Sequence, residues 1–185
     1  MSASEPVASS PVELEAALDA SRAAPRDEGV VELIVRRPAV DEREVVEEAE
    51  LDVDEGLIGD SWSARGRSGG RPANLDAQLT LTGARAVAFA AGTRDRWALA
   101  GDQLVVDLDL SGENLPPGTR LAVGGAVIEV TPEPHTGCKK FAARFGLETL
   151  QAFNSPEGRA LNLRGINTRV VEGGKVRVGD PVRKL

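Results

Sequence analysis

The chain has 185 residues, of which 41% are hydrophobic and 28% charged, a composition typical of one globular domain with a substantial core. Its net charge of −7 argues against nucleic-acid binding, and no apolar run reaches the length that a transmembrane helix needs. The N-terminal stretch also lacks the basic and apolar regions of a secretory signal. We therefore expect a cytoplasmic protein that interacts with neither nucleic acid nor membrane.

The first 29 residues have the character of an extension. A polar leader precedes Ser10-Pro11-Val12-Glu13, which has the form of a capping box with Pro at the first helical position. This pattern predicts a helix over residues 11–22, whose thin apolar stripe would dock on the domain surface. The expected division is residues 1–29 as helical extension and linker, and residues 30–185 as one β-barrel or sandwich domain.

From residue 30 onward, short apolar or alternating segments bounded by Gly, Pro, Asn and Asp predict strands. The predicted strands cover residues 30–36, 43–49, 78–82, 103–108, 120–123 and 127–130. The clearest hairpin covers residues 120–130 and turns at Gly124-Gly125. A second hairpin is predicted over residues 168–178, with its turn at Glu172-Gly173-Gly174.

Helices are predicted only at residues 84–90, 139–145 and 147–153 after the first one. Many strands and few helices indicate a mainly-β fold with helical decorations. The acidic residues within 41–60 lack the pattern of a calcium loop and are interpreted as a solvated strand face and turn. The Gly- and Arg-rich segment 63–74 lacks a phosphate-loop pattern and is interpreted as a mobile loop beside the site.

The chain contains one cysteine, Cys138, and one histidine, His135. One cysteine excludes an intramolecular disulfide and a multi-cysteine zinc site, and one histidine leaves no usual ligand set for a protein-bound metal. A metal, if the protein uses one, would therefore arrive inside a cofactor.

Cys138 lies at a junction between a loop containing Pro and Gly and the helix predicted from Lys139. The positive end of that helix, together with Lys139 and Lys140, favours a thiolate. A reactive sulfur is one interpretation of this cysteine, and a small buried hydrophobic residue is the other. His135 is free to assist Cys138, but a spacing of three residues on a Pro-containing loop does not ensure their contact, so a cysteine-hydrolase dyad is the weaker option.

Charge is distributed unevenly along the chain. Residues 135–185 contain ten basic and four acidic residues, a net of +6, so residues 1–134 carry the remaining −13. A positive region around Cys138 would attract an anionic ligand or an acidic partner. The alternative is that these basic side chains are scattered over the surface.

Three stretches resemble the MOSC family, whose domain is found at the C-terminus of molybdenum cofactor sulfurases. They are GDQLVVDLDLSGENL (101–115), RLAVGGAVIEVTPEPHTGCKKFAARFG (120–146) and LNLRGINTRVVEGGKVRVGDPV (161–182). The Gly-Glu-Asn-Leu turn, the Pro-x-x-Gly-Cys loop and the final Arg-Val…Gly-x-Val-x-x-Gly-Asp hairpin follow in the expected order, and the resemblance covers roughly the last 155 residues. It implies a closed β-barrel of complex topology, like the β-barrel domain of pyruvate kinase, with a few short helices.

The resemblance implies molybdenum and sulfur chemistry at Cys138, which occupies the loop position of the cysteine in standalone bacterial members. In one role Cys138 ligates the molybdenum of the molybdenum cofactor (molybdopterin), and the protein reduces N-hydroxylated compounds with electrons from a partner reductase. In relatives of this kind the ligand cysteine lies further along, where this chain has Ala152-Phe153-Asn154-Ser155. Ligation would therefore fall to Cys138.

Two other roles stay open. Cys138 would act as a sulfur carrier if it received a persulfide from a cysteine desulfurase or another sulfur donor and delivered it to a cofactor or metal–sulfur cluster. The chain would then be a sulfur transferase. The remaining option is a non-catalytic binding barrel in which Cys138 is inert. No part of the chain resembles the pyridoxal-phosphate domain of full-length sulfurases, so that coenzyme would act on a partner.

The candidate site residues follow from these roles. Cys138 and His135 are the catalytic candidates, and Cys138 is also the molybdenum ligand through the cofactor. Basic side chains suit the phosphate of molybdopterin or an acidic donor protein, and Asn167 is a candidate to line the cleft. The basic candidates are Lys139, Lys140, Arg144, Arg164 and Arg169.

Overall fold

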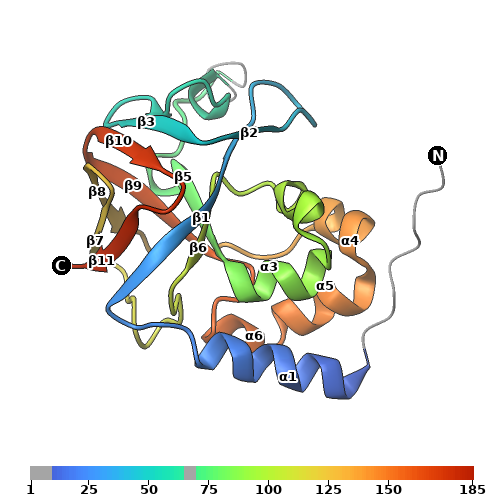
Figure 1. The fold of residues 1–185 in the computed structure, drawn as a ribbon. Helices are drawn as coiled ribbons and strands as arrows, with labels where there is room; N and C mark the ends of the chain where they lie inside the picture. Colours follow the sequence, from blue (N-terminus) through green and yellow to red (C-terminus); the bar gives the residue numbers. More distant parts are fainter. Residues whose placement is uncertain (1–9, 65–69) are drawn as a thin grey trace.

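The structure of the protein is a computed structural model that describes residues 10–64 and 70–185. Residues 1–9, predicted as the polar leader, and residues 65–69, within the segment predicted as a mobile loop, lie outside the described residues. Figure 1 shows the strands gathered on one side of the molecule and most of the helices on the other.

Seven strands close into a mixed β-barrel, which confirms the predicted fold. Their order is β11-β7-β8-β9-β5-β6-β1, and β1 pairs again with β11 to close the barrel. The strands are β1 (Glu28–Arg36), β5 (Leu79–Gly83), β6 (Leu104–Asp107), β7 (Arg120–Val123), β8 (Ala126–Val130), β9 (Ile166–Glu172) and β11 (Pro181–Lys184). The β5–β6 pair is parallel, and the closing β1–β11 pair is antiparallel.

A smaller sheet lies at one end of the barrel. It contains β10 (Gly174–Arg177), β3 (Glu48–Asp52) and β4 (Gly56–Leu57), whereas β2 (Glu44–Val46) extends the barrel sheet beside β1. The single strand predicted over residues 43–49 is therefore divided between two sheets. Strand β2 pairs with β1, while β3 pairs with β10 and β4.

The two predicted hairpins have different outcomes. Strands β7 and β8 form the first one, with Val123 opposite Ala126 and Gly124 in the left-handed region at φ +53°. The second is wrong, because β9 pairs with β5 and β8, and β10 pairs with β3. Gly173 and Gly174 do not form a turn but allow neighbouring backbone segments to pass close by. A Cβ on Gly174 would overlap the carbonyl of Gly125. The chain thus crosses from the barrel to the smaller sheet.

A helical layer covers one side of the barrel (Figure 1). It contains α1 (Pro11–Arg22), α3 (Ala84–Ala91), the 3-10 helix η2 (Arg94–Ala100), α4 (Lys139–Phe145), α5 (Leu147–Asn154) and α6 (Pro156–Ala160). A further 3-10 turn, η1 (Leu75–Ala77), precedes β5. The four predicted helices are present within one residue of their predicted bounds, and η1, η2 and α6 were not predicted. No helix in the part of the chain described is long and apolar enough to cross a bilayer.

Helix α1 begins at the predicted capping box. The Ser10 hydroxyl accepts a hydrogen bond from the Glu13 N–H, and the Glu13 carboxylate accepts one from the Ser10 N–H. Ala17 and Leu18 are buried, and the Arg85 guanidinium on α3 donates to the Ala20 carbonyl. The helix therefore packs against the helical layer, as its thin apolar stripe predicts, while the division of the chain at residue 30 stays a prediction.

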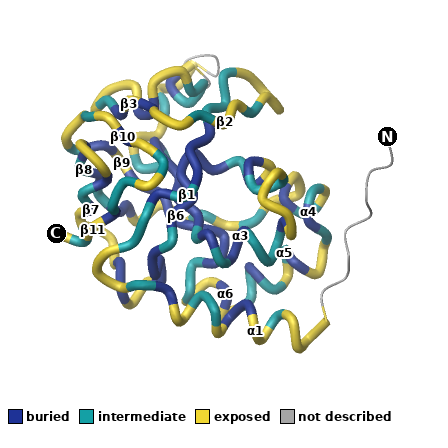
Figure 2. Tube along the Cα trace, in the orientation of Figure 1, coloured by how far each residue is buried: buried dark blue, intermediate teal, exposed yellow. Residues whose placement is uncertain are grey.

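The molecule has two hydrophobic clusters. Figure 2 shows buried segments both in the barrel and in the helical layer. The barrel cluster is aliphatic and includes Ile34, Leu81 and Ile128 among its fully buried side chains. The second cluster joins the outer face of the barrel to the helices and contains Phe141, Phe145 and Phe153. The rings of Phe141 and Phe145 lie 4.9 Å apart, and those of Phe141 and Phe153 lie 5.3 Å apart. This aromatic group fixes α4 and α5 on the barrel.

Candidate functional site

Cys138 ends the loop that joins β8 to the helical layer and is the N-cap residue of α4, with an extended backbone at φ −122° and ψ 177°. The loop is held at two points before this position. The Asn154 carboxamide accepts a hydrogen bond from the Gly137 N–H at 3.1 Å and donates one to the Gly137 carbonyl at 3.3 Å. The Asn167 carboxamide donates to the carbonyls of Glu133 and Pro134. The position of Cys138 is therefore determined by side chains from α5 and β9.

The Cys138 thiol is exposed and electrostatically activated. Partial burial would raise the pKa of the thiol, but hydrogen bonds from the backbone N–H groups of Phe141 and Lys140 oppose this. The positive charges of Arg164 and Arg144 act in the same direction, and the net result is a pKa below the ordinary value for cysteine. Because the thiolate is the nucleophilic and metal-binding form, this residue is poised for either chemistry.

Cys138 opens onto a cleft with a volume of about 340 Å³. The cleft lies between the loop that follows β1, the segment at residues 100–101 and helix α4. Its lining residues are Arg37, Ala39, Val40, Asp41, Arg43, Ala100, Gly101, Cys138, Lys140, Phe141, Arg144 and Arg164. Five of these side chains are basic and one is acidic, so the walls around the thiol favour an anionic ligand.

Two of the cleft arginines are anchored by contacts with the rest of the fold, which are largely buried for Arg37 and exposed for Arg144. Arg37 pairs with the fully buried carboxylate of Asp60 at 2.8 Å and donates to the Gly101 carbonyl at 2.9 Å. Arg144 donates from Nη1 to the Leu99 carbonyl at 2.9 Å. These contacts hold the guanidinium groups in place before any ligand binds, which reduces the cost of ordering them.

Behind the cleft, Arg164 forms a buried network with Asp102 and His135. The Asp102 carboxylate contacts Arg164 Nη1 at 2.5 Å and His135 Nε2 at 2.6 Å. Arg164 also donates to the Ala100 carbonyl, and its guanidinium lies over the Phe141 ring. Burial would raise the pKa of Asp102, but the charge of Arg164 and the contact with His135 hold it well below its usual range. Asp102 therefore fixes both partners while remaining ionised.

His135 faces a different pocket from Cys138. This pocket has a volume of about 160 Å³, and its walls include His135, Asn154 and Arg159. Arg164 borders both the pocket and the Cys138 cleft. The two catalytic candidates, Cys138 and His135, are therefore connected only indirectly. His135 contacts Asp102, Asp102 contacts Arg164, and Arg164 borders the Cys138 cleft.

The basic candidates are divided by their positions. The structure brings Lys140, Arg144 and Arg164 together with Cys138 in the cleft. Lys139 is exposed and is not among the residues that line the cleft. Arg169 lies on β9, where it pairs with Glu129 at 2.6 Å and with Asp76 at 3.8 Å, also outside the lining. Asn167 acts on the backbone of the Cys138 loop and not on the cleft itself.

Sequence reasoning did not find several residues of the site: Arg37, Asp41, Arg43 and Asp102. They precede Cys138 by 36 residues or more and are brought to the site by the tertiary fold, which no local sequence pattern records. Within residues 10–64 and 70–185, no three side chains of His, Cys, Asp or Glu lie close enough together to hold a metal ion.

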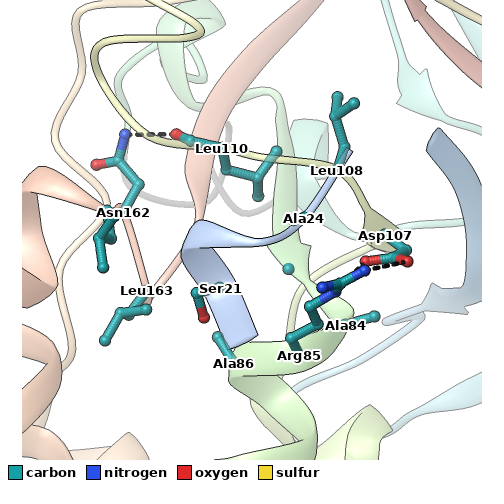
Figure 3. Close-up of a pocket in the computed structure, with 12 residues that line it drawn as sticks. Ser21, Ala24, Ala84, Arg85, Ala86, Asp107, Leu108, Leu110, Asn162 and Leu163 are labelled. Atoms are coloured by element: carbon teal, nitrogen blue, oxygen red, sulfur yellow. Dashed lines mark hydrogen bonds and ion pairs between the residues drawn. The ribbon is translucent and has the colours of Figure 1, made fainter. Parts of the chain in front are cut away.

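A third and smaller cavity lies between α1 and the barrel, away from Cys138 (Figure 3). Its volume of about 20 Å³ is sufficient for roughly one water molecule. In Figure 3 the Arg85 side chain reaches Asp107, with a distance of 2.8 Å from Nε to Oδ1. This cavity belongs to the docking of α1 and is too small for a substrate.

Comparisons with known proteins support this fold. The family model described as the MOSC domain matches residues 91–183. The YuaD protein from Bacillus subtilis superposes with a TM-score of 0.58 at 19% identity, covering 84% of this chain and 94% of that one. YiiM from Escherichia coli superposes with a TM-score of 0.54 at 21% identity, covering 84% and 69% of the two chains. The search of curated proteins finds no match. At these identities the solved structures show a shared fold.

Proposed function

The chain belongs to the MOSC domain family, and from this premise we propose that it binds the molybdenum cofactor in the Cys138 cleft and reduces N-hydroxylated compounds. The observation that carries the proposal is the combination of a thiol of lowered pKa with a cleft lined by five basic side chains. An inert cysteine would need neither of these features.

The residues present fit the chemistry of this cofactor. A thiolate is a soft ligand suited to molybdenum, and Cys138 supplies it at the rim of the cleft. Guanidinium and ammonium groups suit a phosphate, and Arg144 and Lys140 supply them beside the thiol. The buried Nε of Arg164 has no hydrogen-bond partner, so the polar wall behind Cys138 is not fully satisfied by the protein alone.

When bound, the cofactor would supply the two-electron redox change at molybdenum. Conversion of an N-hydroxyl group to the amine consumes two electrons and two protons and releases water, so the proposal includes a partner reductase as the electron source. Cys138 would act as the metal ligand, and Lys140 and Arg144 would hold the phosphate. Asp102 would hold the Arg164 side chain in its orientation toward the thiolate, because the Asp102 carboxylate lies 2.5 Å from Arg164 Nη1.

The test is the cofactor content of protein expressed in a host that makes the cofactor. We expect stoichiometric molybdenum by elemental analysis and a matching amount of pterin by fluorescence after oxidation. The Cys138→Ser variant should lose the molybdenum, whereas Arg169→Gln, outside the cleft lining, should retain it and serves as the matched control. Wild-type protein without molybdenum and pterin would contradict the proposal.

A second function, the persulfide carrier, is favoured by one observation: the Cys138 thiol is exposed at the rim of its cleft. A cysteine desulfurase or another sulfur donor would therefore have access to it. In that reaction the thiolate attacks the donor persulfide, a new S–S bond forms on Cys138, and the donor leaves as a thiolate. Persulfide labelling of the wild type in the absence of molybdenum would establish this role. Failure of both assays would leave a non-catalytic binding barrel.

A further inference from the structure

An acidic side chain enters the basic cleft from the loop that joins β1 to β2. Asp41 lies in a turn closed by a hydrogen bond from the Glu42 N–H to the Ala39 carbonyl at 3.2 Å. Its backbone is in the left-handed region at φ +61°, which Asp and Asn tolerate better than other residues with a side chain. This conformation places the carboxylate beside helix α4.

The Asp41 carboxylate contacts two of the cleft cations at once. Its Oδ1 atom lies 3.5 Å from Lys140 Nζ and 3.3 Å from Arg144 Nη2. Both cations line the cleft with Cys138, as Asp41 itself does. One carboxylate oxygen between an ammonium and a guanidinium is the arrangement that a ligand phosphate oxygen would adopt there.

The contacts of the Asp41 carboxylate with Lys140 and Arg144 are weak enough for a ligand to displace it. The side chains of Asp41 and Lys140 are 64% and 65% exposed, and ion pairs with such exposure are weak and readily exchanged. Arg144 has separate anchors, because its Nη1 donates to the Leu99 carbonyl and its own carbonyl accepts from Arg96. Loss of Asp41 would therefore leave the guanidinium in position.

We propose that Lys140 and Arg144 form an anion subsite of the Cys138 cleft, that Asp41 occupies this subsite as an internal carboxylate, and that a phosphate group displaces it. Displacement releases the turn at residues 39–42 from α4, so ligand entry and loop movement are one event. The inference rests on the proposed function for the identity of the natural ligand, a phosphate-bearing cofactor. The subsite itself is argued from the contacts of Asp41.

The experiment measures binding of inorganic phosphate to cofactor-free protein by calorimetry and by protection of Cys138 from iodoacetamide. Asp41→Asn keeps the shape and the left-handed backbone but removes the charge, and we expect it to tighten phosphate binding about three- to fivefold. Glu42→Gln is the matched control, because it removes the same charge from the adjacent exposed residue. It should change binding less than about twofold. Equal effects of the two variants, or no effect of Asp41→Asn, would overturn the inference.

Two further measurements test the subsite and the displacement. In the Lys140→Gln background, the gain from Asp41→Asn should shrink, because the two residues share one interaction. Hydrogen exchange of the amides at residues 39–43 should speed up when phosphate binds the wild type, and slower or unchanged exchange would refute displacement. None of these readouts requires molybdenum. Absence of molybdenum with a positive phosphate result would therefore contradict the proposed function alone, and the reverse result would contradict only this inference.

Discussion

The barrel interior is filled by aliphatic side chains, whereas three phenylalanines lie at the centre of the helical layer beside it. The cleft does not draw equally on these two regions. Cys138, Lys140 and Arg144 belong to α4 and its N-cap, while Arg164 lies in the loop before β9 and stacks on Phe141. The barrel therefore supports the site, and the aromatic layer shapes it. Stability and thiol reactivity should therefore respond differently to changes in each region.

The largest effect is expected from Phe141, which joins both the aromatic cluster and the cleft. Phe141→Ala should lower the free energy of unfolding by about 4 kcal/mol, because it leaves a cavity under α4. It should also slow the alkylation of Cys138, since the helix that presents the thiol loosens. Urea denaturation and iodoacetamide kinetics measure the two effects. Leu81→Ala in the barrel should lower stability to a similar extent with the alkylation rate unchanged, and slowed alkylation in that variant would break the comparison.

Removal of the Asp102 charge should have the next largest effect. Asp102→Asn leaves the buried guanidinium of Arg164 without its counter-charge, and we expect a loss of about 3 kcal/mol in urea denaturation. Asp107→Asn is the matched control, because it breaks the partly exposed pair with Arg85 below α1. That variant should cost less than about 1 kcal/mol. Equal losses would show that the Asp102 network is no more buried in solution than the Asp107 pair.

The same carboxylate should give the protein an acid-sensitive component of stability. The folded pKa of Asp102 lies below its unfolded value, so its contribution is fully present above the unfolded pKa, about 4, and is lost as the pH falls through the folded pKa. Wild-type stability should therefore decrease on acidification below about pH 4. In Asp102→Asn this part of the decrease should be missing when unfolding is measured across that range. Parallel pH profiles would contradict the assignment.

A smaller effect is expected at the exposed side of the cleft. The charge of Arg144 lowers the pKa of the Cys138 thiol, so Arg144→Gln should raise that pKa and slow alkylation at pH 7 by about two- to fivefold. The stability should change by no more than about 1 kcal/mol, because Arg144 is a side chain at the surface of α4. Arg169→Gln provides the control, since it removes the same charge outside the cleft lining. An equal decrease of the alkylation rate in both variants would show that the thiol pKa responds to the net charge of the protein and not to the position of Arg144.

The smallest effect should come from α1, the part of the helical layer farthest in the sequence from Cys138. Ser10→Ala removes the hydroxyl that caps this helix and should lower stability by about 0.5 to 1 kcal/mol in thermal denaturation. The alkylation rate of Cys138 should stay at the wild-type value. A changed alkylation rate would show that the stability of α1 affects the Cys138 cleft, which would contradict the independence of the two.

Local sequence signals were sufficient for the elements but not for their pairing. Ser10-Pro11 at a helix start gave α1 correctly, and Ser155-Pro156 has the same form at the start of α6, where Ser155 caps the helix. That signal could have been found. The partners of β10 could not, because the glycines at residues 173 and 174 suit a tight turn and a close crossing equally well, and distant contacts with β3 and Gly125 decide between them.

The site shows the same limit. The helix start at Cys138 could be predicted from local sequence, but the charges that lower the pKa of its thiol are those of Arg164 and Arg144 and not those of the predicted Lys139 and Lys140. Asp102 and Arg164 are 62 residues apart, so their pairing depends on the barrel and leaves no local pattern. Arg169 was indistinguishable from Arg164 by residue type, and only the register of β9 opposite β8 directs it to Glu129.

Barrel closure has a consequence for how fast the protein folds. The closing strands β1 and β11 bring Glu28 and Arg183 together across 155 residues of chain, with a hydrogen bond of 2.8 Å between their side chains. Such a contact can form only after the conformational entropy of a very long loop has been lost, and folding rates fall as contacting residues become more distant in sequence. We therefore expect closure to be a late event and refolding to be slow for a chain of this size.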